Sequence, residues 1–160
     1  YLKCQSVTCI DSNKNKLNIL PNLKKIKFIH VDKIKLKTLT KVNQNKFDLI
    51  IDCTGSTKLI EKMFSLCKPF SGKFIIIGNT KLKDRISLKA WDFINGKTFT
   101  GAWGNGGTIM KNFKLNEKIL ISQIRNVKKI LSKKNYKIFQ INKAINDFMK
   151  GKIVRPIIKF

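Results

Sequence analysis

Residues 47–79 limit the possible folds most, because a strand, a helix and a second strand can be read directly from them. Leu49, Ile50 and Ile51 form a short apolar run that ends in polar residues and a glycine, which is typical of a strand buried on both faces. A second apolar run covers residues 74–77. Two buried strands joined by a helix predict a right-handed parallel crossover, so we expect an α/β fold with a parallel sheet.

The helix between these two strands is predicted to begin at Thr57, which can cap its N-terminus, and to stop before Pro69 and Gly72. Its apolar residues recur at helical spacing and are expected to form one buried face: Leu59, Ile60, Met63, Phe64 and Cys67. Ligands of parallel sheets bind beyond the carboxyl ends of the strands. A functional site is therefore expected at residues 53–56 and 77–79.

Further elements follow from the same patterns on both sides of this unit. Strands are predicted at residues 6–10, 28–31, 98–103, 138–141 and 153–160, and helices at residues 13–20, 90–95, 116–134 and 143–150, the last capped by Asn142. Residues 36–44 are a short polar helix or a loop, and residues 80–89 form a surface excursion. The helix at 116–134 is expected to pack on the core through Ile119, Leu120, Ile124, Val127 and Leu131.

Asp11 follows the first predicted strand directly, just before a helix start. Dinucleotide-binding folds hold the adenosine ribose with an acidic residue at this place, although an aspartate there is also a common helix cap. The expected fold class is a Rossmann-like, doubly wound parallel sheet. It is expected to be incomplete, because nothing before Ser6 supplies the central first strand and its glycine-rich turn. Residues 1–5 read as the tail of a preceding helix, and the chain as one that begins in mid-fold.

The composition supports one hydrophobic core, with 160 residues of which 42% are hydrophobic. No apolar run is long enough to span a bilayer and no signal peptide is visible, so a cytoplasmic location and no membrane partner are expected. The four cysteines include no C-x-x-C pair. Thiols in a reducing compartment are therefore favoured over disulfides or a metal site.

The formal net charge of +25 invites a nucleic-acid interpretation. The excess is almost all lysine, spread from Lys3 to Lys159, and arginine occurs only at Arg85, Arg125 and Arg155. Phosphate and base recognition favour clustered arginines with interleaved aromatic residues, and neither cluster is present. Nucleic-acid binding is therefore kept only as an alternative.

Four segments together resemble the cofactor-binding domain and C-terminus of zinc-type medium-chain alcohol dehydrogenases. They read CIDSNKNKL, FDLIIDCTGSTKLIEKMFSLCKPFSGKFIIIGN, INGKTFTGAWGNGG and INKAINDFMKGKIVRPIIKF. The similarity as a whole runs from about Cys4 to Phe160. The resemblance implies an NAD-dependent oxidoreductase that transfers hydride between NAD and an alcohol, polyol or sugar hydroxyl. It implies a partial dinucleotide-binding domain at 1–135, and a segment at 136–160 that returns toward a catalytic domain not contained in this sequence.

The same resemblance implies cofactor-binding roles at matching positions. Asp11 and Lys16 would contact the adenosine ribose, and the charge of Asp11 would favour NAD over NADP. The other contacts would be made beside the adenine by Thr54, Gly55 and Ser56, at the nicotinamide by Ile77, Gly78 and Asn79, at its carboxamide by Ala102, Trp103 and Gly104, and at the pyrophosphate by Arg155. It assigns no catalytic residue and no metal ligand to this chain, and it places the zinc ligands outside it.

The sequence also departs from the family pattern. The GxGxxG turn is absent, no cysteines have zinc-ligand spacing, and the single histidine, His30, lies in a predicted strand where a structural role is expected. This chain alone is therefore expected to be inactive. Two alternatives remain: a basic nucleotide- or nucleic-acid-binding module, and a structural remnant that forms a homodimer through the strand at 98–103.

Overall fold

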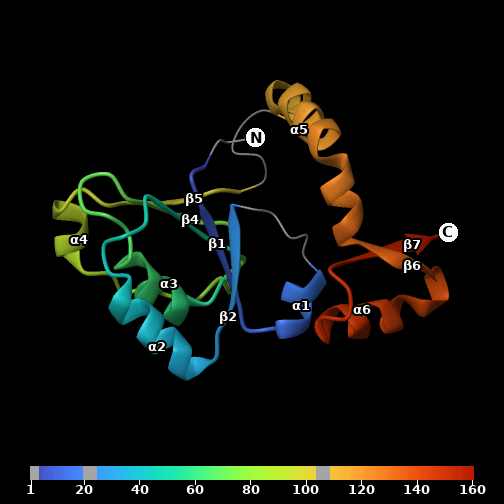
Figure 1. Ribbon diagram of the computed structural model, residues 1–160, viewed down its shortest axis with the longest axis horizontal. Coiled ribbons are helices and arrows are strands. Elements are labelled where there is room, and N and C mark those ends of the chain that lie inside the picture. The colour runs from blue at the N-terminus through green and yellow to red at the C-terminus, as the bar shows by residue number, and fades with distance from the viewer. Residues whose placement is uncertain (1–3, 20–24, 104–108) are drawn as a thin grey trace. The chain divides into compact units, whose positions relative to one another are not determined.

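The computed structural model describes residues 4–19, 25–103 and 109–160 and alternates strands with helices (Figure 1). The strands are β1 (Val7–Asp11), β2 (Ile26–His30), β3 (Leu49–Asp52), β4 (Lys73–Ile76), β5 (Thr98–Gly101), β6 (Leu131–Lys137) and β7 (Arg155–Lys159). The helices are α1 (Lys14–Ile19), α2 (Lys33–Val42), α3 (Thr57–Phe64), α4 (Ala90–Ile94), α5 (Ile109–Ile130) and α6 (Ile141–Met149), with a 3₁₀ turn η1 (Ile138–Gln140).

The chain forms two compact units, one of Tyr1–Asp32 with Met110–Phe160 and one of Lys33–Ile109. All described strand pairs are parallel. The first unit contains the pairs β1-β2 and β6-β7, and the second contains the sheet β3-β4-β5. These pairings confirm the predicted α/β, Rossmann-like class. The predicted division into 1–135 and 136–160 stays a prediction.

The pairings also match the doubly wound strand order 3-2-1-4-5-6, if the first five strands here are read as strands 2 to 6 of that order. The described residues hold no strand before Val7. The incomplete sheet stays a prediction.

The core of the second unit forms where α3 covers one face of the β3-β4-β5 sheet. Ile60, Phe64, Cys67 and Phe74 are fully buried there. Phe99 stacks on Phe74, with ring centroids 5.3 Å apart. The predicted apolar face of the helix is confirmed by these residues.

Two details of this predicted unit are wrong. Thr57 does not cap α3: the N-cap is Ser56, whose extended backbone lets its carbonyl accept hydrogen bonds from the N–H groups of Leu59 and Ile60, both at 2.9 Å. The strand β3 is not buried on both faces, because α3 covers only the face that carries Ile50. The alternate side chains of Leu49 and Ile51 are 47% and 51% exposed.

A buried ion pair joins α4 and β5 to the end of α3. Lys97 donates from Nζ to Asp92 Oδ1 at 2.7 Å and to the Ser65 carbonyl at 3.3 Å, and its side chain is only 3% exposed. Its ammonium also lies 6.0 Å from the Phe64 ring centroid. Burial beside this pair raises the pKa of the Cys67 thiol to about 11.

In the first unit α6 runs beside β6 and β7 (Figure 1). Tyr136 is buried between them and donates from Oη to Asp147 Oδ2 at 3.1 Å. The strand predicted at 138–141 is wrong, because Gln140 Oε1 accepts the Lys137 N–H at 3.1 Å and closes the η1 turn, while the strand precedes it as β6. Asn142 lies inside α6 and does not cap it.

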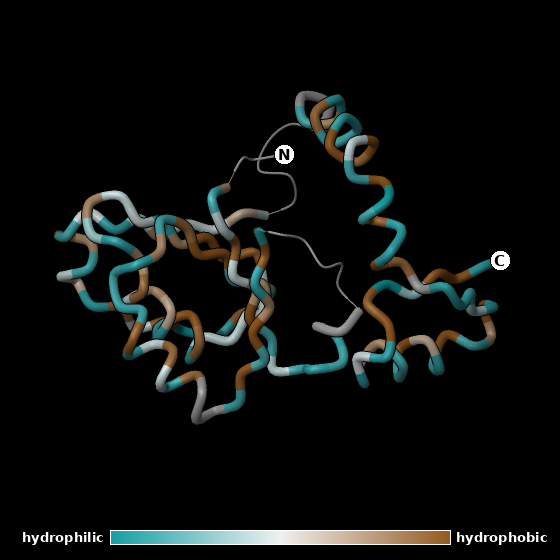
Figure 2. The backbone as a smooth tube through the Cα atoms, viewed as in Figure 1, coloured by the Kyte–Doolittle hydropathy of each residue, from teal (hydrophilic) through white to brown (hydrophobic). Residues whose placement is uncertain are grey.

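Helix α5 begins seven residues before the predicted start, at Ile109, and gives way to β6 at Leu131. Apolar and polar residues alternate along it (Figure 2). Leu120 and Ile124 are predicted to face the core, but their side chains are 48% and 41% exposed, so this part of the prediction is wrong. None of the described helices is long and apolar enough to cross a membrane.

Candidate functional site

The carboxyl end of β3 is organised by one buried carboxylate, that of Asp52. Its side chain accepts three hydrogen bonds from the turn that follows: from Thr54 N–H at 3.1 Å, from Thr54 Oγ1 at 2.6 Å and from Gly55 N–H at 3.0 Å. Thr54 Oγ1 in turn accepts the Ser56 N–H at 3.1 Å. Asp52 is 6% exposed, so these bonds replace the water it loses on burial.

This turn packs directly on the turn that ends β4. Gly55 has φ +66°, and a Cβ built on it would lie 2.0 Å from the carbonyl oxygen of Asn79. A Cβ on Gly78 would lie 2.3 Å from the Gly55 nitrogen. Because no side chain fits at either position, the predicted residues 53–56 and 77–79 do come together at one edge of the sheet.

The hydrogen bonds of the turn limit what it can bind. The N–H groups of Thr54 and Gly55 point at Asp52 and are not free to bind a phosphate. The nearby Cys53 thiol is a poor nucleophile, because partial burial and the adjacent Asp52 charge both raise its pKa. A ligand at this edge of the sheet would therefore contact the outer surface of the turn, because the turn has no free N–H groups at Thr54 and Gly55 to bind an anion.

The ends of β4 and β5 present backbone and apolar surface. The N–H groups of Ile77 and Gly78 both donate to the Asp52 carbonyl, at 2.9 and 3.0 Å, and Ala102 N–H donates to the Ile76 carbonyl at 2.9 Å. Ile77 is 49% exposed and Trp103 is 88% exposed. Gly104, the last residue predicted here, lies outside the described residues. Strand β5 ends at Gly101, so Ala102 and Trp103 belong to the segment after it.

In the first unit Asp11 lies at the carboxyl end of β1, as predicted. Its Oδ1 accepts the Asn13 N–H at 2.8 Å, whereas its Oδ2 has no hydrogen bond to any described residue. His30, opposite Asp11 in the β1-β2 register, places Nε2 3.1 Å from the Ser12 carbonyl oxygen. This contact is in keeping with the structural role expected for His30.

Lys16 and the C-terminal segment meet near this strand end. The Lys16 ammonium lies 5.7 Å from the centroid of the Phe148 ring on α6. Gly151, with φ +68°, lies so close to Asn13 that a Cβ would come within 2.2 Å of its amide nitrogen. Arg155 is exposed and begins β7 opposite Leu131. The structure thus brings Asp11, Lys16 and the end of α6 together and leaves Arg155 facing solvent.

Sequence reasoning missed two residues that shape these sites. Asp52 was taken only as the polar end of a strand, although an aspartate followed two residues later by threonine and then glycine is a signal for a side-chain-stabilised turn. Asn13 was taken only as the first residue of the helix. Its Oδ1 accepts the N–H groups of Asn15 at 3.0 Å and Lys16 at 3.4 Å, so it caps α1.

The residues present do not fit a zinc site. Among residues 4–19, 25–103 and 109–160, no three histidine, cysteine or acidic side chains gather where they could hold a metal ion. Structural and catalytic zinc sites in proteins use three or four such ligands.

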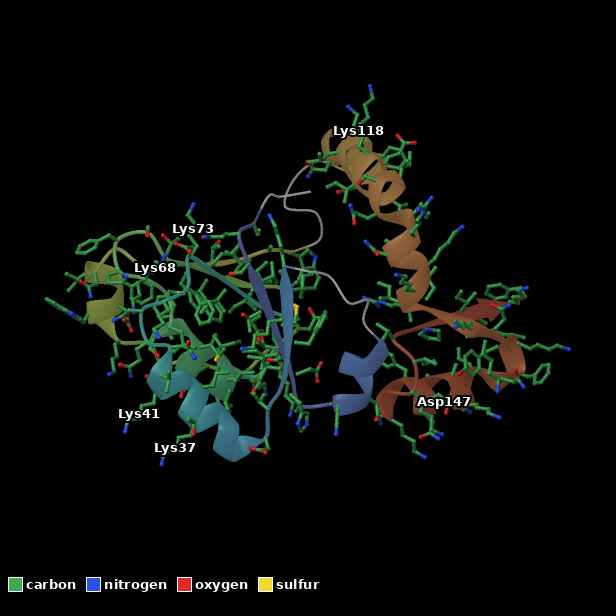
Figure 3. All side chains as sticks on the ribbon, viewed as in Figure 1. Lys37, Lys41, Lys68, Lys73, Lys118 and Asp147 are labelled. Carbon is green, nitrogen blue, oxygen red and sulfur yellow. The ribbon has the colours of Figure 1, made fainter. Side chains whose placement is uncertain are left out.

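The lysines labelled in Figure 3 come from several different elements. Lys37 and Lys41 project from α2, Lys118 from α5, and Lys73 lies on β4. Lys68 pairs with Asp48 at 2.7 Å, where hydrogen bonding by the ammonium lowers the pKa of the Asp48 carboxyl. This spread agrees with the distribution of lysine along the sequence.

Comparison with known proteins settles the family. Residues 2–118 match the family described as zinc-binding dehydrogenase, which is well over half of the chain. The chain belongs to the zinc-binding dehydrogenase family. This confirms the resemblance to the cofactor-binding domain of zinc-type medium-chain alcohol dehydrogenases.

A curated relative of this chain is alcohol dehydrogenase-like 2 of Arabidopsis thaliana, which is 31% identical over 131 aligned residues. The match covers 76% of this chain and 32% of that protein. The chain spans about a third of the length of the curated relatives it matches.

Two solved structures share the fold. Benzyl alcohol dehydrogenase from Acinetobacter calcoaceticus matches with a TM-score of 0.77 and 19% identity, over 98% of this chain and 43% of that one. The Bacillus subtilis protein yhfP, solved with NAD bound, matches with a TM-score of 0.65 and 13% identity, over 97% of this chain and 47% of that one.

Proposed function

We propose that this chain is the NAD-binding part of an alcohol dehydrogenase that transfers hydride between a hydroxyl substrate and NAD. The observation that carries the proposal is the Asp11 carboxylate at the carboxyl end of β1, with Oδ1 held by the Asn13 N–H and Oδ2 free of described partners. A carboxylate oxygen fixed at this place can accept a hydrogen bond from a ribose hydroxyl.

The same carboxylate favours NAD over NADP. A 2′-phosphate would bring about two negative charges next to Asp11, whereas a ribose hydroxyl donates a hydrogen bond to it. Lys16 lies in the first turns of the helix that follows and would contact the same ribose. Arg155 would pair with the pyrophosphate.

The second group of proposed contacts lies at the strand ends of the other unit. Thr54, Gly55 and Ser56 would line the adenine side. The nicotinamide would meet Ile77, Gly78 and Asn79, and its carboxamide would meet Ala102, Trp103 and Gly104. The Ala102 N–H is already donated within the sheet, so its carbonyl is the group offered to a carboxamide NH₂.

In this proposal no residue of the chain performs the hydride transfer itself. NAD supplies the hydride chemistry when bound, and the residues named above bind and orient it. Zinc ligands and the substrate pocket belong to other parts of the intact enzyme, so the chain alone is proposed to be inactive. The substrate class is an alcohol, polyol or sugar, and the proposed location is the cytoplasm.

The edge strand β5 is the proposed dimer surface. It pairs only with β4 in its sheet, so one row of its backbone N–H and C=O groups remains available to a second copy. Sedimentation should then show a monomer–dimer equilibrium that shifts with concentration. A monomer at every concentration would contradict the homodimer but not the cofactor site.

Titration of the chain with NADH and NADPH tests the main proposal. NADH is expected to bind more tightly than NADPH, and Asp11→Ala is expected to weaken NADH binding and to narrow the difference between the two cofactors. Asp84→Ala, at an exposed aspartate of the 80–89 excursion, is the control and should bind NADH like the unchanged chain.

Salt separates this proposal from the alternative of a basic nucleic-acid-binding module. Binding to polyanions weakens steeply as salt rises, whereas a site based on Asp11 should depend on salt much less. Absence of NADH binding together with tight, salt-sensitive binding of single-stranded DNA would overturn the cofactor proposal.

A further inference from the structure

Lys16 has an aromatic partner from the far end of the chain. Its Nζ lies 5.7 Å from the centroid of the Phe148 ring, within the distance at which a cation is attracted to the face of an aromatic ring. Lys16 is half-buried and Phe148 is 40% exposed, so the contact is partly shielded from water. It joins α1 to α6.

A second contact fixes the end of α6 against the start of α1. Gly151 is buried and its backbone lies against the Asn13 side chain, where a Cβ would come within 2.2 Å of the amide nitrogen. Asn13 in turn caps α1 through Asn15 and Lys16 and donates its own N–H to Asp11. Phe148 and Gly151 therefore hold the segment that carries both Asp11 and Lys16.

We propose that Phe148 is a positioning residue for the cofactor: its ring holds the Lys16 ammonium in place for the adenosine ribose. A lysine side chain is flexible, and ordering it on binding costs free energy. The ring face occupies one side of the ammonium and leaves N–H donors for a ribose hydroxyl. This inference rests on the proposed function, because it assigns Phe148 a part in the same NAD site.

The experiment is a double-mutant cycle on NADH affinity. Phe148→Leu keeps an apolar side chain but removes the ring, and it should weaken NADH binding about two- to five-fold, which is the range expected for a partly exposed cation–π contact. In a Lys16→Gln background the same change should have no effect. Phe148→Trp should retain or improve affinity, because tryptophan binds cations best.

The matched control is Phe139→Leu. Phe139 also has a lysine over its ring, with Lys137 Nζ 5.9 Å from the centroid, but it is 76% exposed in η1. This variant should bind NADH like the unchanged chain.

A readout without cofactor tests the contact itself. In ¹³C-dimethyl-lysine NMR, with the Lys16 signal assigned by Lys16→Arg, the ring current of Phe148 should shift the Lys16 methyl resonance upfield, and Phe148→Leu should abolish that shift. No shift in the unchanged chain would overturn the proposal.

The outcomes separate this proposal from the function on which it rests. If NADH binds and Phe148→Leu has no effect, tightens binding, or weakens it equally with and without Lys16, the role of Phe148 is overturned and the NAD site stands. If NADH does not bind at all, both are overturned, whatever the NMR shift shows.

Discussion

At the residue scale, Asp52 shows how one buried carboxylate sets the shape of a strand end. It accepts hydrogen bonds from two backbone N–H groups and one hydroxyl of the next turn, and its own carbonyl accepts two more from Ile77 and Gly78. The two turns of the second unit are thereby joined through one residue.

Asp52→Ala should destabilise the chain by about 1–3 kcal/mol, because Thr54 and Gly55 would keep N–H groups without an acceptor. Urea unfolding measures this change. The control is Asp48→Ala, an exposed carboxylate paired only with Lys68, which should leave the free energy of unfolding nearly unchanged. Equal losses in the two variants would contradict the role given to Asp52.

Two glycines of the same unit make a matched pair. Gly55→Ala should cost about 3 kcal/mol or more, because Gly55 has φ +66° and the new Cβ would collide with the Asn79 carbonyl. At Gly101 the nearest atom to a new Cβ is 4.0 Å away, so Gly101→Ala should be neutral or slightly stabilising. Thermal unfolding of both variants checks the contrast, and a tolerated Gly55→Ala would refute the close packing of the two turns.

The sequence predicts some single residues well and others not at all. The part of Asp11 in cofactor binding stays a proposal. Its place at a strand end was predictable, because it directly follows the predicted strand at 6–10. The contacts of Asp52 and Phe148 were not predictable, because they depend on how a turn folds back on itself and on which distant helix lies nearby. The spacing of residues along the sequence reveals neither the fold of the turn nor the nearby helix.

At the element scale, the core under α3 has a pH response that follows from Cys67. Its pKa is about 11 in the folded chain against an ordinary 9.0, mainly because of burial. Because the pKa is raised, the thiol in the folded state stays protonated up to a higher pH than the thiol in the unfolded state. The stabilisation is therefore fully present below about pH 9 and is lost as the pH rises toward 11, by up to roughly 3 kcal/mol.

Comparing Cys67→Ala with the unchanged chain in urea at pH 8 and pH 10.5 measures this loss. The unchanged chain should lose more stability between the two pH values than Cys67→Ala, whereas Cys4→Ala, at an exposed thiol, should behave like the unchanged chain. Tyr136, whose pKa is also raised by burial, titrates in all three and cancels from the comparison. Equal losses in all three would contradict the buried state of Cys67.

Helices and strands were predictable where the spacing of apolar residues and the positions of glycine and proline indicate the same element. The strand, helix and strand at 49–76 combine apolar runs with glycine and proline stops, and all three elements form. The apolar residues Ile138 and Phe139 suggested a strand, but the Gln140 side chain closes a turn there, and the true strand β6 has the lysine-rich sequence LSKKNYK. Its pairing with β7 decides its structure, and local hydropathy does not reveal that pairing.

At the scale of the whole molecule, the strand pairs within each unit follow the order of a doubly wound, dinucleotide-binding fold. The order could be predicted because the crossover connections leave few topologies. The burial of α5 and of the outer face of β3 was not correctly predicted. An apolar face in the sequence predicts burial, but it does not identify the element that buries it. Leu120, Leu49 and Ile51 remain about half exposed.

NAD binding at the strand ends is tested most directly by amide NMR of the chain titrated with NADH. Binding there should change the chemical shifts of the proposed contacts, in residues 11–16, 54–56, 77–79 and 102–104 and at Arg155, and the changes should be weaker in Asp11→Ala. No shift changes, or changes spread over the lysines of α2 and α5 and abolished by salt, would contradict it.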